Sequence, residues 1–331
     1  MLHSLDYSLP RLPDDSTSVW GDRMMARGDT VRVLEIEHLL VPLDGSRLAE
    51  ASLPAALSLA ERLRARVTLL HVLERRAPAT IHGEWHLSVA PEAEAYLNGV
   101  ASRFADAGIP VETHVHPNPE GNVAASIAAH AAELGADLIV LCTHGEGGMR
   151  GWLSGSLAQH VVRRVNAPVL LVRPDGASAA PFAPRETLVA LDGTQEGEAA
   201  LPAATALARA WATPLRLVCV VPTLGTVGGD RGAVARMKPS ATSAVLDMEQ
   251  GAAAAYLASL AEHVSTAGIP SEVEVVRGDP AGTVATLAAR TDGALLAIAT
   301  HGRSGLDAIW TASVGAKVVG RVTGPILLVR P

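Results

Sequence analysis

A glycine-rich turn suited to binding an anion occurs twice in this chain of 331 residues. In the first turn, Cys142-Thr-His144-Gly145 is followed by nine residues and then by Gly155-Ser156, which open an apolar helix. A glycine lacks a Cβ, so the backbone can approach a ligand closely there or adopt a positive φ. The free N–H groups at the start of a helix favour a negative charge. The pattern predicts a phosphate-binding turn that does without a Walker lysine.

A carboxylate follows the first predicted strand of each half. Pro42-Leu43-Asp44-Gly45-Ser46 ends that strand in the first half, and Ala190-Leu191-Asp192-Gly193-Thr194 ends it in the second. Ligands of open α/β sheets bind beyond the carboxyl ends of the strands, where the strand order reverses. We therefore expect Asp44 to lie near the glycine-rich turn and near Val72, at the end of the second strand. A lone Asp more commonly caps a turn, and in a single glycine-rich turn Ser156 would more commonly cap a helix; the spacing and the duplication favour a ligand site.

The chain contains two copies of one domain. Residues 143–174 match residues 300–331 without a gap, and residues 39–60 match residues 187–208. Similarity on this scale indicates a duplicated domain rather than a short repeat. The predicted organisation is an N-terminal arm (1–30), a first domain (31–174), a linker (175–184) and a second domain (185–331).

Strands and helices alternate within each domain, which predicts an open α/β sheet with helices on both faces. Most of the predicted strands are continuously apolar, as expected for parallel strands buried on both sides. We expect a loop at 224–233 and a helix at 244–267. The apolar strand at 326–329 should not remain an exposed edge, so we expect it to pair with strand 169–172 across a pseudo-twofold axis. The predicted strands are 38–43, 67–73, 111–116, 137–142 and 169–172, then 187–191, 215–221, 272–276, 294–299 and 326–329.

Composition excludes several classes of function. The formal net charge of −7 and sequence pI near 5.9 argue against a nucleic-acid partner. The sequence lacks an apolar run of the roughly 18 residues that a membrane span needs, and its N-terminus does not read as a signal peptide. Cys142 and Cys219 lie in apolar strands, which predicts two buried thiols and a cytoplasmic location. The sequence motifs of serine hydrolases, Walker NTPases and zincins are absent.

Two histidine pairs have spacings that a metal could use. His82 and His86 are four residues apart, and His114 and His116 fall on one face of a predicted strand. Two imidazoles make an incomplete ligand set. We therefore expect these pairs to be solvated or locally hydrogen-bonded, and we assign no metal site.

The turn, its nine-residue spacing and the closing strand PVLLVRP together resemble the ATP-binding signature of the universal stress proteins. VPLDGS and LLHV also resemble the first two strands of that family, and the resemblance covers about residues 36–174 and 185–331. It implies a Rossmann-like or flavodoxin-like five-stranded domain, with strand order 3-2-1-4-5, that pairs through its last strand. It also implies bound ATP, in one subclass together with a metal ion such as Mg²⁺.

The resemblance also suggests which residues bind the nucleotide. Asp44 and Val72 would line its adenine and ribose end, and Cys142 stands where the first glycine of the signature is expected. In the second domain Ala299 and Ala312 replace two signature glycines, so we expect a weaker or empty site there. The full predicted set is Pro42, Asp44, Gly45, Ser46, Val72, Cys142, His144, Gly145, Gly155, Ser156 and Leu157, with Ala190, Asp192, Gly193, Thr194, Val220, Ala299, His301, Gly302, Ser313 and Val314 in the second domain.

These observations favour a nucleotide-responsive stress protein that changes its surface for a protein partner when ATP binds. Two alternatives remain open: an interaction scaffold of the same fold that binds no nucleotide, and a slow metal-dependent ATP hydrolase that uses Asp44. No candidate base or leaving-group lysine is visible, which favours binding over turnover. The protein partner, and a homodimer beyond the internal pair, are left open.

We expect that replacing Gly145 or Gly155 with leucine will weaken ATP binding at least tenfold, about 1.4 kcal/mol. The added side chain would occupy the space where phosphate meets bare backbone, while the fold should be kept. Calorimetric titration with Mg-ATP measures the affinity, and circular dichroism checks the fold. Unchanged affinity in both variants would exclude this turn as the phosphate site.

Overall fold

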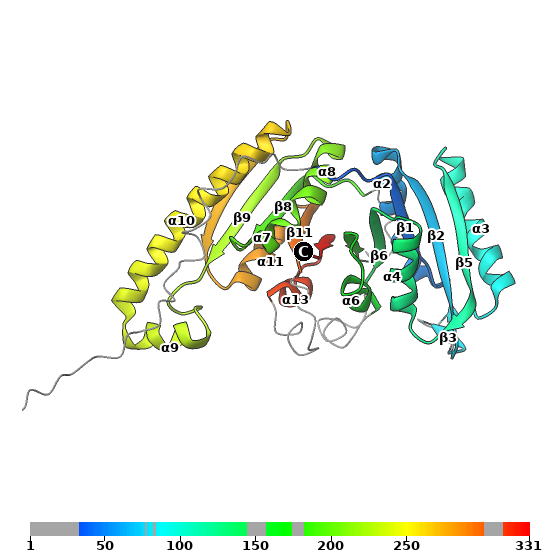
Figure 1. Ribbon diagram of the computed structural model, residues 1–331, viewed down its shortest axis with the longest axis horizontal. Helices are drawn as coiled ribbons and strands as arrows, with labels where there is room; N and C mark the ends of the chain where they lie inside the picture. The colour runs from blue at the N-terminus through cyan, green and yellow to red at the C-terminus, as the bar shows by residue number, and fades with distance from the viewer. Residues whose placement is uncertain (1–32, 77, 82–83, 144–156, 174–181, 301–313) are drawn as a thin grey trace, which may run out of the picture.

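The computed structural model describes residues 33–331 apart from residue 77 and the ranges 82–83, 144–156, 174–181 and 301–313. Ten strands of this part form one sheet, in the order β10-β9-β8-β11-β12-β7-β6-β1-β2-β5. The first copy supplies one half of this sheet and the second copy the other (Figure 1). Within each half the strands are parallel and follow the order 3-2-1-4-5. The predicted fold class is confirmed.

The first copy begins its helical cover with a split helix. The Ala/Leu-rich run after Ser46 forms α1 and α2, with Pro54 in the first turn of α2, where its missing N–H is tolerated. The elements of this copy are β1 (His38–Pro42), α1 (Arg47–Glu50), α2 (Leu53–Leu63), β2 (Arg66–Glu74), β3 (Thr80–Ile81), β4 (Glu84–Trp85), α3 (Ala90–Asp106), β5 (Val111–Glu120), α4 (Val123–Glu133), β6 (Leu138–Cys142), α6 (Leu157–Val162) and β7 (Val169–Val172).

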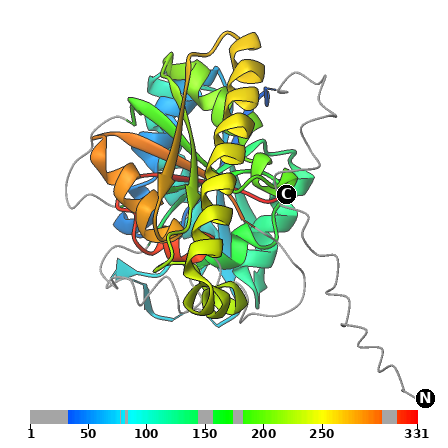
Figure 2. The same cartoon turned by 90° about the vertical axis from the view of Figure 1, so that its left-hand side faces the viewer.

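Among the described residues the second copy repeats this order, except that a helix, α9, stands between its second strand and its long helix where the first copy has the short strands β3 and β4. The segment predicted as a loop at 224–233 contains the start of a helix, α9, and the next helix, α10, begins at Pro239 rather than near residue 244. Figure 2 shows the long helix α10 running across its half of the sheet. The elements are β8 (Glu186–Leu191), α7 (Gln195–Glu198), α8 (Leu201–Trp211), β9 (Leu215–Val221), α9 (Gly229–Met237), α10 (Pro239–Thr266), β10 (Ser271–Arg277), α11 (Pro280–Arg290), β11 (Ala294–Ala299), α13 (Val314–Val319) and β12 (Ile326–Val329).

Alternate residues of the strands enter two apolar clusters, one on each side of the sheet. Leu39 and Val41 of β1 join the cluster that includes residues of α2, α3, α8 and α10. Leu40, between them, joins the cluster that includes residues of α4, α6, α11 and α13. Because successive side chains of a strand point to opposite faces, a strand covered on both sides must be apolar throughout. This explains the continuous apolar runs of the sequence.

The two copies are joined through their last strands. β12 pairs with β7 in antiparallel fashion, with Ile326 opposite Leu171 and Leu328 opposite Val169, as predicted. Equivalent arginines reinforce this contact: Arg173 of the first copy donates to the Val319 carbonyl of the second at 2.6 Å. Arg330 of the second copy donates to the Arg163 carbonyl of the first at 3.1 Å. Each guanidinium thus reaches the carboxyl end of the other copy's final helix, where the helix dipole favours a cation.

Across the residues that the structure describes, no helix combines the length and apolar character that a membrane crossing requires.

We expect Arg173→Ala and Arg330→Ala each to lower the free energy of unfolding by about 1.5–3 kcal/mol, the range for hydrogen bonds made by charged groups. Arg164→Ala is the matched control, because exposed Arg164, which lies just beyond α6, donates to the His160 carbonyl within its own copy. That substitution should change stability by less than about 0.5 kcal/mol. Urea unfolding compares the three variants, and equal losses would contradict a special role for the arginines between the copies.

Candidate functional site

The candidate site begins at the turn after β1, where one carboxylate oxygen is held in place. Oδ1 of Asp44 accepts hydrogen bonds from the backbone N–H of Ser46 at 2.9 Å and from its hydroxyl at 2.7 Å. Ser46 Oγ in turn accepts from the N–H of Ala49 and so caps α1. Gly45 has φ +90°, a conformation that favours glycine. The turn therefore fixes the orientation of the Asp44 carboxylate at the carboxyl end of β1.

The second copy builds the same turn from its own residues. Asp192 Oδ1 accepts from the N–H of Thr194 at 3.0 Å and from its hydroxyl at 2.6 Å. Thr194 caps α7 by accepting from the N–H of Gly197, and Gly193 has φ +78°. The two carboxylates differ in exposure: Asp44 is half-buried, whereas Asp192 is exposed. Asp44 and Asp192 thus each accept hydrogen bonds within their own turn, the role that an aspartate in a turn commonly has. Oδ2 of Asp44 has no described hydrogen bond.

The end of β6 comes close to this carboxylate. Burial and, secondarily, the charge of Asp44 raise the pKa of the Cys142 thiol to about 12. The same two causes, burial and then Asp192, raise the pKa of Cys219 to about 12 in the second copy. Beyond Cys142, the N–H of Thr143 donates to the Val172 carbonyl at 2.8 Å, and Thr300 repeats this bond to Val329 at 2.7 Å. The chain thus leaves the fourth strand in the same way in both copies.

Two residues that sequence reasoning missed cover the first turn. A Cβ built on Gly45 would lie 2.7 Å from Cδ1 of Leu87, so Leu87 packs directly over the glycine. Buried His71 places its two ring nitrogens 2.8 Å from the Leu43 carbonyl and 3.0 Å from the Leu87 carbonyl. It therefore ties the irregular segment after β2 to the turn. In the second copy Cys219 stands in the place of His71, because β9 pairs with β8 in the same register as β2 pairs with β1.

A half-buried glutamate and a half-buried tyrosine support the turn in each copy. The hydroxyl of Tyr96 in α3 donates to Glu50 at 3.3 Å, and that of Tyr256 in α10 donates to Glu198 at 3.0 Å. Burial, followed by the charge of Glu50, raises the pKa of Tyr96 well above its usual value. A neutral phenol that donates to a carboxylate fixes the helix after each Asp-Gly turn against the next long helix.

The structure brings together part of the predicted site. Pro42, Asp44, Gly45 and Ser46 lie at the end of β1, between the neighbouring strands β2 and β6, and Val72 and Cys142 lie near the ends of those strands. Leu157 and Val314 are the first residues of α6 and α13. In the second copy Ala190, Val220 and Ala299 belong to β8, β9 and β11. Several predicted phosphate-end residues lie outside the described residues: His144, Gly145, Gly155, Ser156, His301, Gly302 and Ser313.

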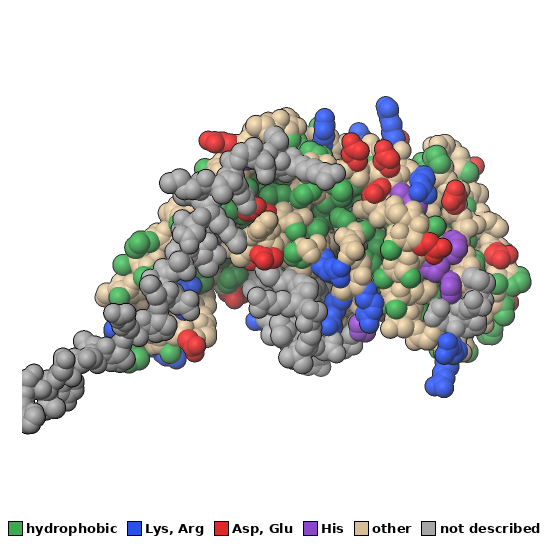
Figure 3. All heavy atoms as spheres, viewed as in Figure 1, with side chains coloured by type: hydrophobic (Ala, Val, Ile, Leu, Met, Phe, Trp, Pro, Cys, Tyr) green, Lys and Arg blue, Asp and Glu red, His purple; other side chains and the backbone are tan. Residues whose placement is uncertain are grey.

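The two histidine pairs of the sequence have different outcomes. His82 lies outside the described residues, and buried His86 places Nε2 3.8 Å from a Glu74 carboxylate oxygen. His114 and His116 instead meet a third imidazole, that of His130, whose ring centroid lies 4.8 Å from His114 and 4.9 Å from His116. Figure 3 shows histidine side chains gathered on the surface between α4 and β5. The sequence indicated the first two of these residues but not the third.

Comparison with known proteins identifies the family of both halves. The model of the universal stress protein family matches residues 35–173 and again residues 185–330. The universal stress protein YxiE of Bacillus subtilis is 31% identical over 148 residues, which are 41% of this chain and 97% of YxiE. A universal stress protein of Archaeoglobus fulgidus has 18% identity and a TM-score of 0.65, over 90% of this chain and 97% of its own. A universal stress protein in complex with cAMP has 23% identity and a TM-score of 0.33, over 43% of this chain and 99% of its own.

We expect Cys142 in the folded protein to resist alkylation at pH 8. A pKa of about 12 in place of the ordinary 9.0 leaves roughly a thousandfold less thiolate at that pH. The raised pKa keeps the thiol neutral in the folded state, so labelling should rise only as the pH approaches that value. Iodoacetamide labelling with mass spectrometry of the Cys142 peptide measures this, and the urea-unfolded chain is the control. Equally fast labelling of both states would contradict the burial of this thiol beside Asp44.

Proposed function

This chain belongs to the universal stress protein family in both of its halves, and on that premise we propose that its first domain binds ATP beyond the carboxyl ends of β1, β2 and β6. The protein would act as a nucleotide-responsive regulator whose bound state presents a different surface to a protein partner. Its two unpaired cysteines are consistent with a reducing compartment, and we place the protein in the cytoplasm.

The observation that carries this proposal is the orientation of Asp44. Its Oδ1 is held by two hydrogen bonds from Ser46, and its half-buried carboxylate stands where the strand order reverses between β1 and β6. A carboxylate attracts hydroxyl and amino donors and repels phosphate. Asp44 is therefore suited to accept a hydrogen bond from a ribose hydroxyl through Oδ2. Val72, which is 7% exposed, would supply apolar contact at the same end of the nucleotide.

The phosphates would lie toward the turn after β6. We propose that backbone N–H groups around Gly145, Gly155 and Ser156 bind the phosphates. Leu157 is the first residue of the helix that follows, α6. Glu146 in the same turn suits a Mg²⁺ ion that neutralises part of the phosphate charge. This half of the site is a prediction from the sequence motif and from the family.

The second domain is proposed as the weaker site. Asp192 keeps the turn geometry but is exposed, so a ligand there would gain less from exclusion of water. Ala299 stands at the end of β11 where the family motif has a glycine, and its Cβ would oppose close approach of phosphate to the backbone. One bound nucleotide per chain is the expected stoichiometry.

Binding without rapid hydrolysis fits the residues of the first domain best. Residues 31–174 contain no lysine, so the ammonium that positions phosphates in Walker ATPases has no counterpart there. Asp44 already accepts two hydrogen bonds in a turn, which suits a fixed acceptor better than a general base. A slow metal-dependent hydrolase and a nucleotide-free scaffold remain the alternatives, and the experiment below separates them.

We expect Asp44→Ala to weaken ATP binding about 10- to 100-fold, since it removes a charged hydrogen-bond acceptor. Asp192→Ala is the matched control: it deletes the same two turn bonds in the other copy and should lower stability by a similar amount, about 1–2 kcal/mol. ATP affinity should barely change in that variant. Titration calorimetry with Mg-ATP, together with urea unfolding, compares the two variants with the parent chain.

Three outcomes discriminate between the functions. Loss of affinity in the Asp44 variant alone supports the proposed site. No ATP binding or thermal shift by the parent chain at millimolar Mg-ATP would favour the scaffold. ADP that accumulates over many turnovers would favour the hydrolase.

A further inference from the structure

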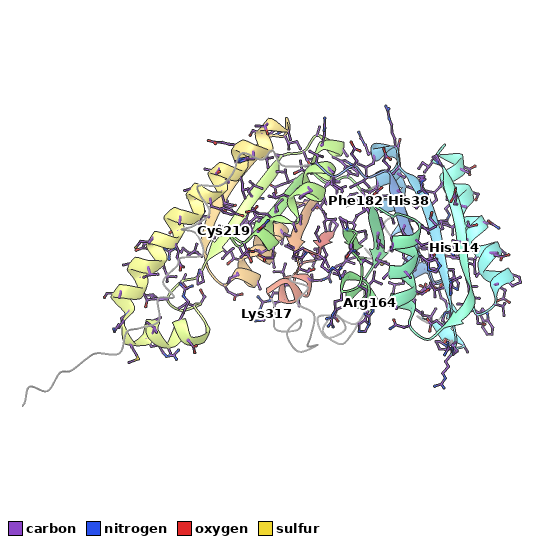
Figure 4. All side chains as sticks on the ribbon, viewed as in Figure 1. His38, His114, Arg164, Phe182, Cys219 and Lys317 are labelled. Carbon is purple, nitrogen blue, oxygen red and sulfur yellow. The ribbon has the colours of Figure 1, made fainter. Side chains whose placement is uncertain are left out.

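Three histidines of the first domain converge from two neighbouring elements. His114 and His116 are two residues apart on β5, so their side chains leave the same face of the strand. They pair with Leu70 and Val72 of β2, which belong to the apolar cluster that Ile127 and Ala131 of α4 complete. That face of the strand is therefore turned toward α4, which carries His130. Figure 4 shows His114 on β5 in the region beside α4.

The distances between the imidazoles approach those of a metal site. One ring nitrogen from each of His114, His116 and His130 lies within 4.8 Å of the other two. Tetrahedral Zn²⁺ with bonds of about 2.0–2.1 Å holds its ligand atoms roughly 3.4 Å apart. Small rotations of the half-buried His114 and His116 side chains can span this difference of up to about 1.4 Å. His114 and His116 are half-buried and His130 is buried, so the cluster is reachable from solvent.

A backbone carbonyl determines which ring nitrogen of neutral His130 carries the proton. Its Nδ1 lies 2.8 Å from the Ser126 carbonyl oxygen, and because a carbonyl can only accept, Nδ1 must donate. In the neutral ring this leaves the lone pair on Nε2. The same arrangement orients metal-binding histidines in known sites, where the second ring nitrogen donates to a carbonyl or carboxylate.

The surroundings of His114 favour its neutral form, and a neutral imidazole is the form that binds metals. Burial lowers the pKa of His114, as do the neighbouring rings of His130 and His116, whereas the charge of Glu133 opposes the shift. Glu133 is exposed on α4, one turn beyond His130. A metal cation bound by the three neutral rings would also be attracted by the Glu133 carboxylate.

The fold does not need these histidines, because the second domain does without them. The register of β10 with β9 places Glu274 and Val276 where the first domain has His114 and His116. Leu287 of α11, 1% exposed, stands in the place of His130. Glu274 is engaged in an ion pair with Arg216. The equivalent position of the helix is thus filled by leucine in one copy and by imidazole in the other.

We propose that His114, His116 and His130 form a binding site for a divalent transition metal, with Zn²⁺ the ion that three imidazoles suit best. The three rings leave the fourth position of a tetrahedral ion to water. The site is separate from any Mg²⁺ that accompanies ATP, because Mg²⁺ prefers oxygen ligands. It does not depend on the proposed nucleotide function.

The test uses the full chain without an affinity tag, treated with chelator and then dialysed. Titration with Zn²⁺ in competition with a chromophoric chelator should give one tight site per chain, with a Kd of micromolar or below. Co²⁺ should produce the intense visible absorption of tetrahedral coordination, a readout that requires no variant. Absence of saturable Zn²⁺ binding, or an octahedral Co²⁺ spectrum, would overturn the proposal.

Two substitutions borrowed from the second domain locate the site. His130→Leu and His116→Val introduce the residues that the other copy tolerates at the same positions, so both should fold. Each should weaken Zn²⁺ binding at least tenfold. His263→Leu is the matched control, since half-buried His263 makes the same bond from Nδ1 to a carbonyl four residues earlier, at 2.6 Å. Binding that survives in the first two variants, or falls equally in the control, would contradict the assignment.

The Asp44→Ala chain separates this inference from the proposed function. Zn²⁺ affinity should be unchanged in that variant even if ATP binding is lost. Conversely, failure of ATP to bind the parent chain would leave the expected Zn²⁺ result as it stands.

Discussion

Backbone hydrogen bonds between β7 and β12 join the last strands of the two copies, and both half-sheets depend on this contact. Each of these strands would otherwise present an apolar edge of unpaired N–H and C=O groups, which is prone to association with other chains. The antiparallel pairing satisfies both edges at once and orders ten strands in one sheet. Arg173 and Arg330 add the same contact twice, each at the end of the other copy's last helix. The remaining helices then cover the two faces of this common sheet.

With the sheet fixed, the two copies can keep a shared geometry and differ in chemistry. Both hold an aspartate by the same two hydrogen bonds after their first strand, and both anchor the following helix through a tyrosine and a glutamate. Around that shared frame the side chains diverge. In the first copy, Leu87 of the irregular segment after β2 packs over Gly45 of the turn. The three-histidine cluster of β5 and α4 is replaced in the second copy by Glu274, Val276 and Leu287. Duplication has therefore given two turns of the same geometry with different surroundings.

Much of the architecture was predictable because it rests on periodic and repeated signals. Continuous apolar runs identified buried parallel strands, and the self-similarity of the halves fixed the domain order. The helix α9 was missed because Gly228, Gly229 and Gly232 made the segment read as a loop. For the site, the Asp-Gly-Ser turn could be inferred, but Leu87 and His71 could not, since their contacts join segments with no spacing pattern. His130 left a usable signal, a histidine adjoining the apolar face of an alanine-rich helix, yet its partners lie on a different element.

The covalent link between the paired strands has a further consequence. Two separate chains that met through β7 and β12 would dissociate on dilution, whereas here the partner strand is held at a high effective concentration by the same polypeptide. Assembly of the sheet is then a first-order process, insensitive to how much protein the cell contains. Cross-pairing with single-domain proteins of similar shape is suppressed for the same reason, so the two unequal copies always occur together, in a ratio of one to one.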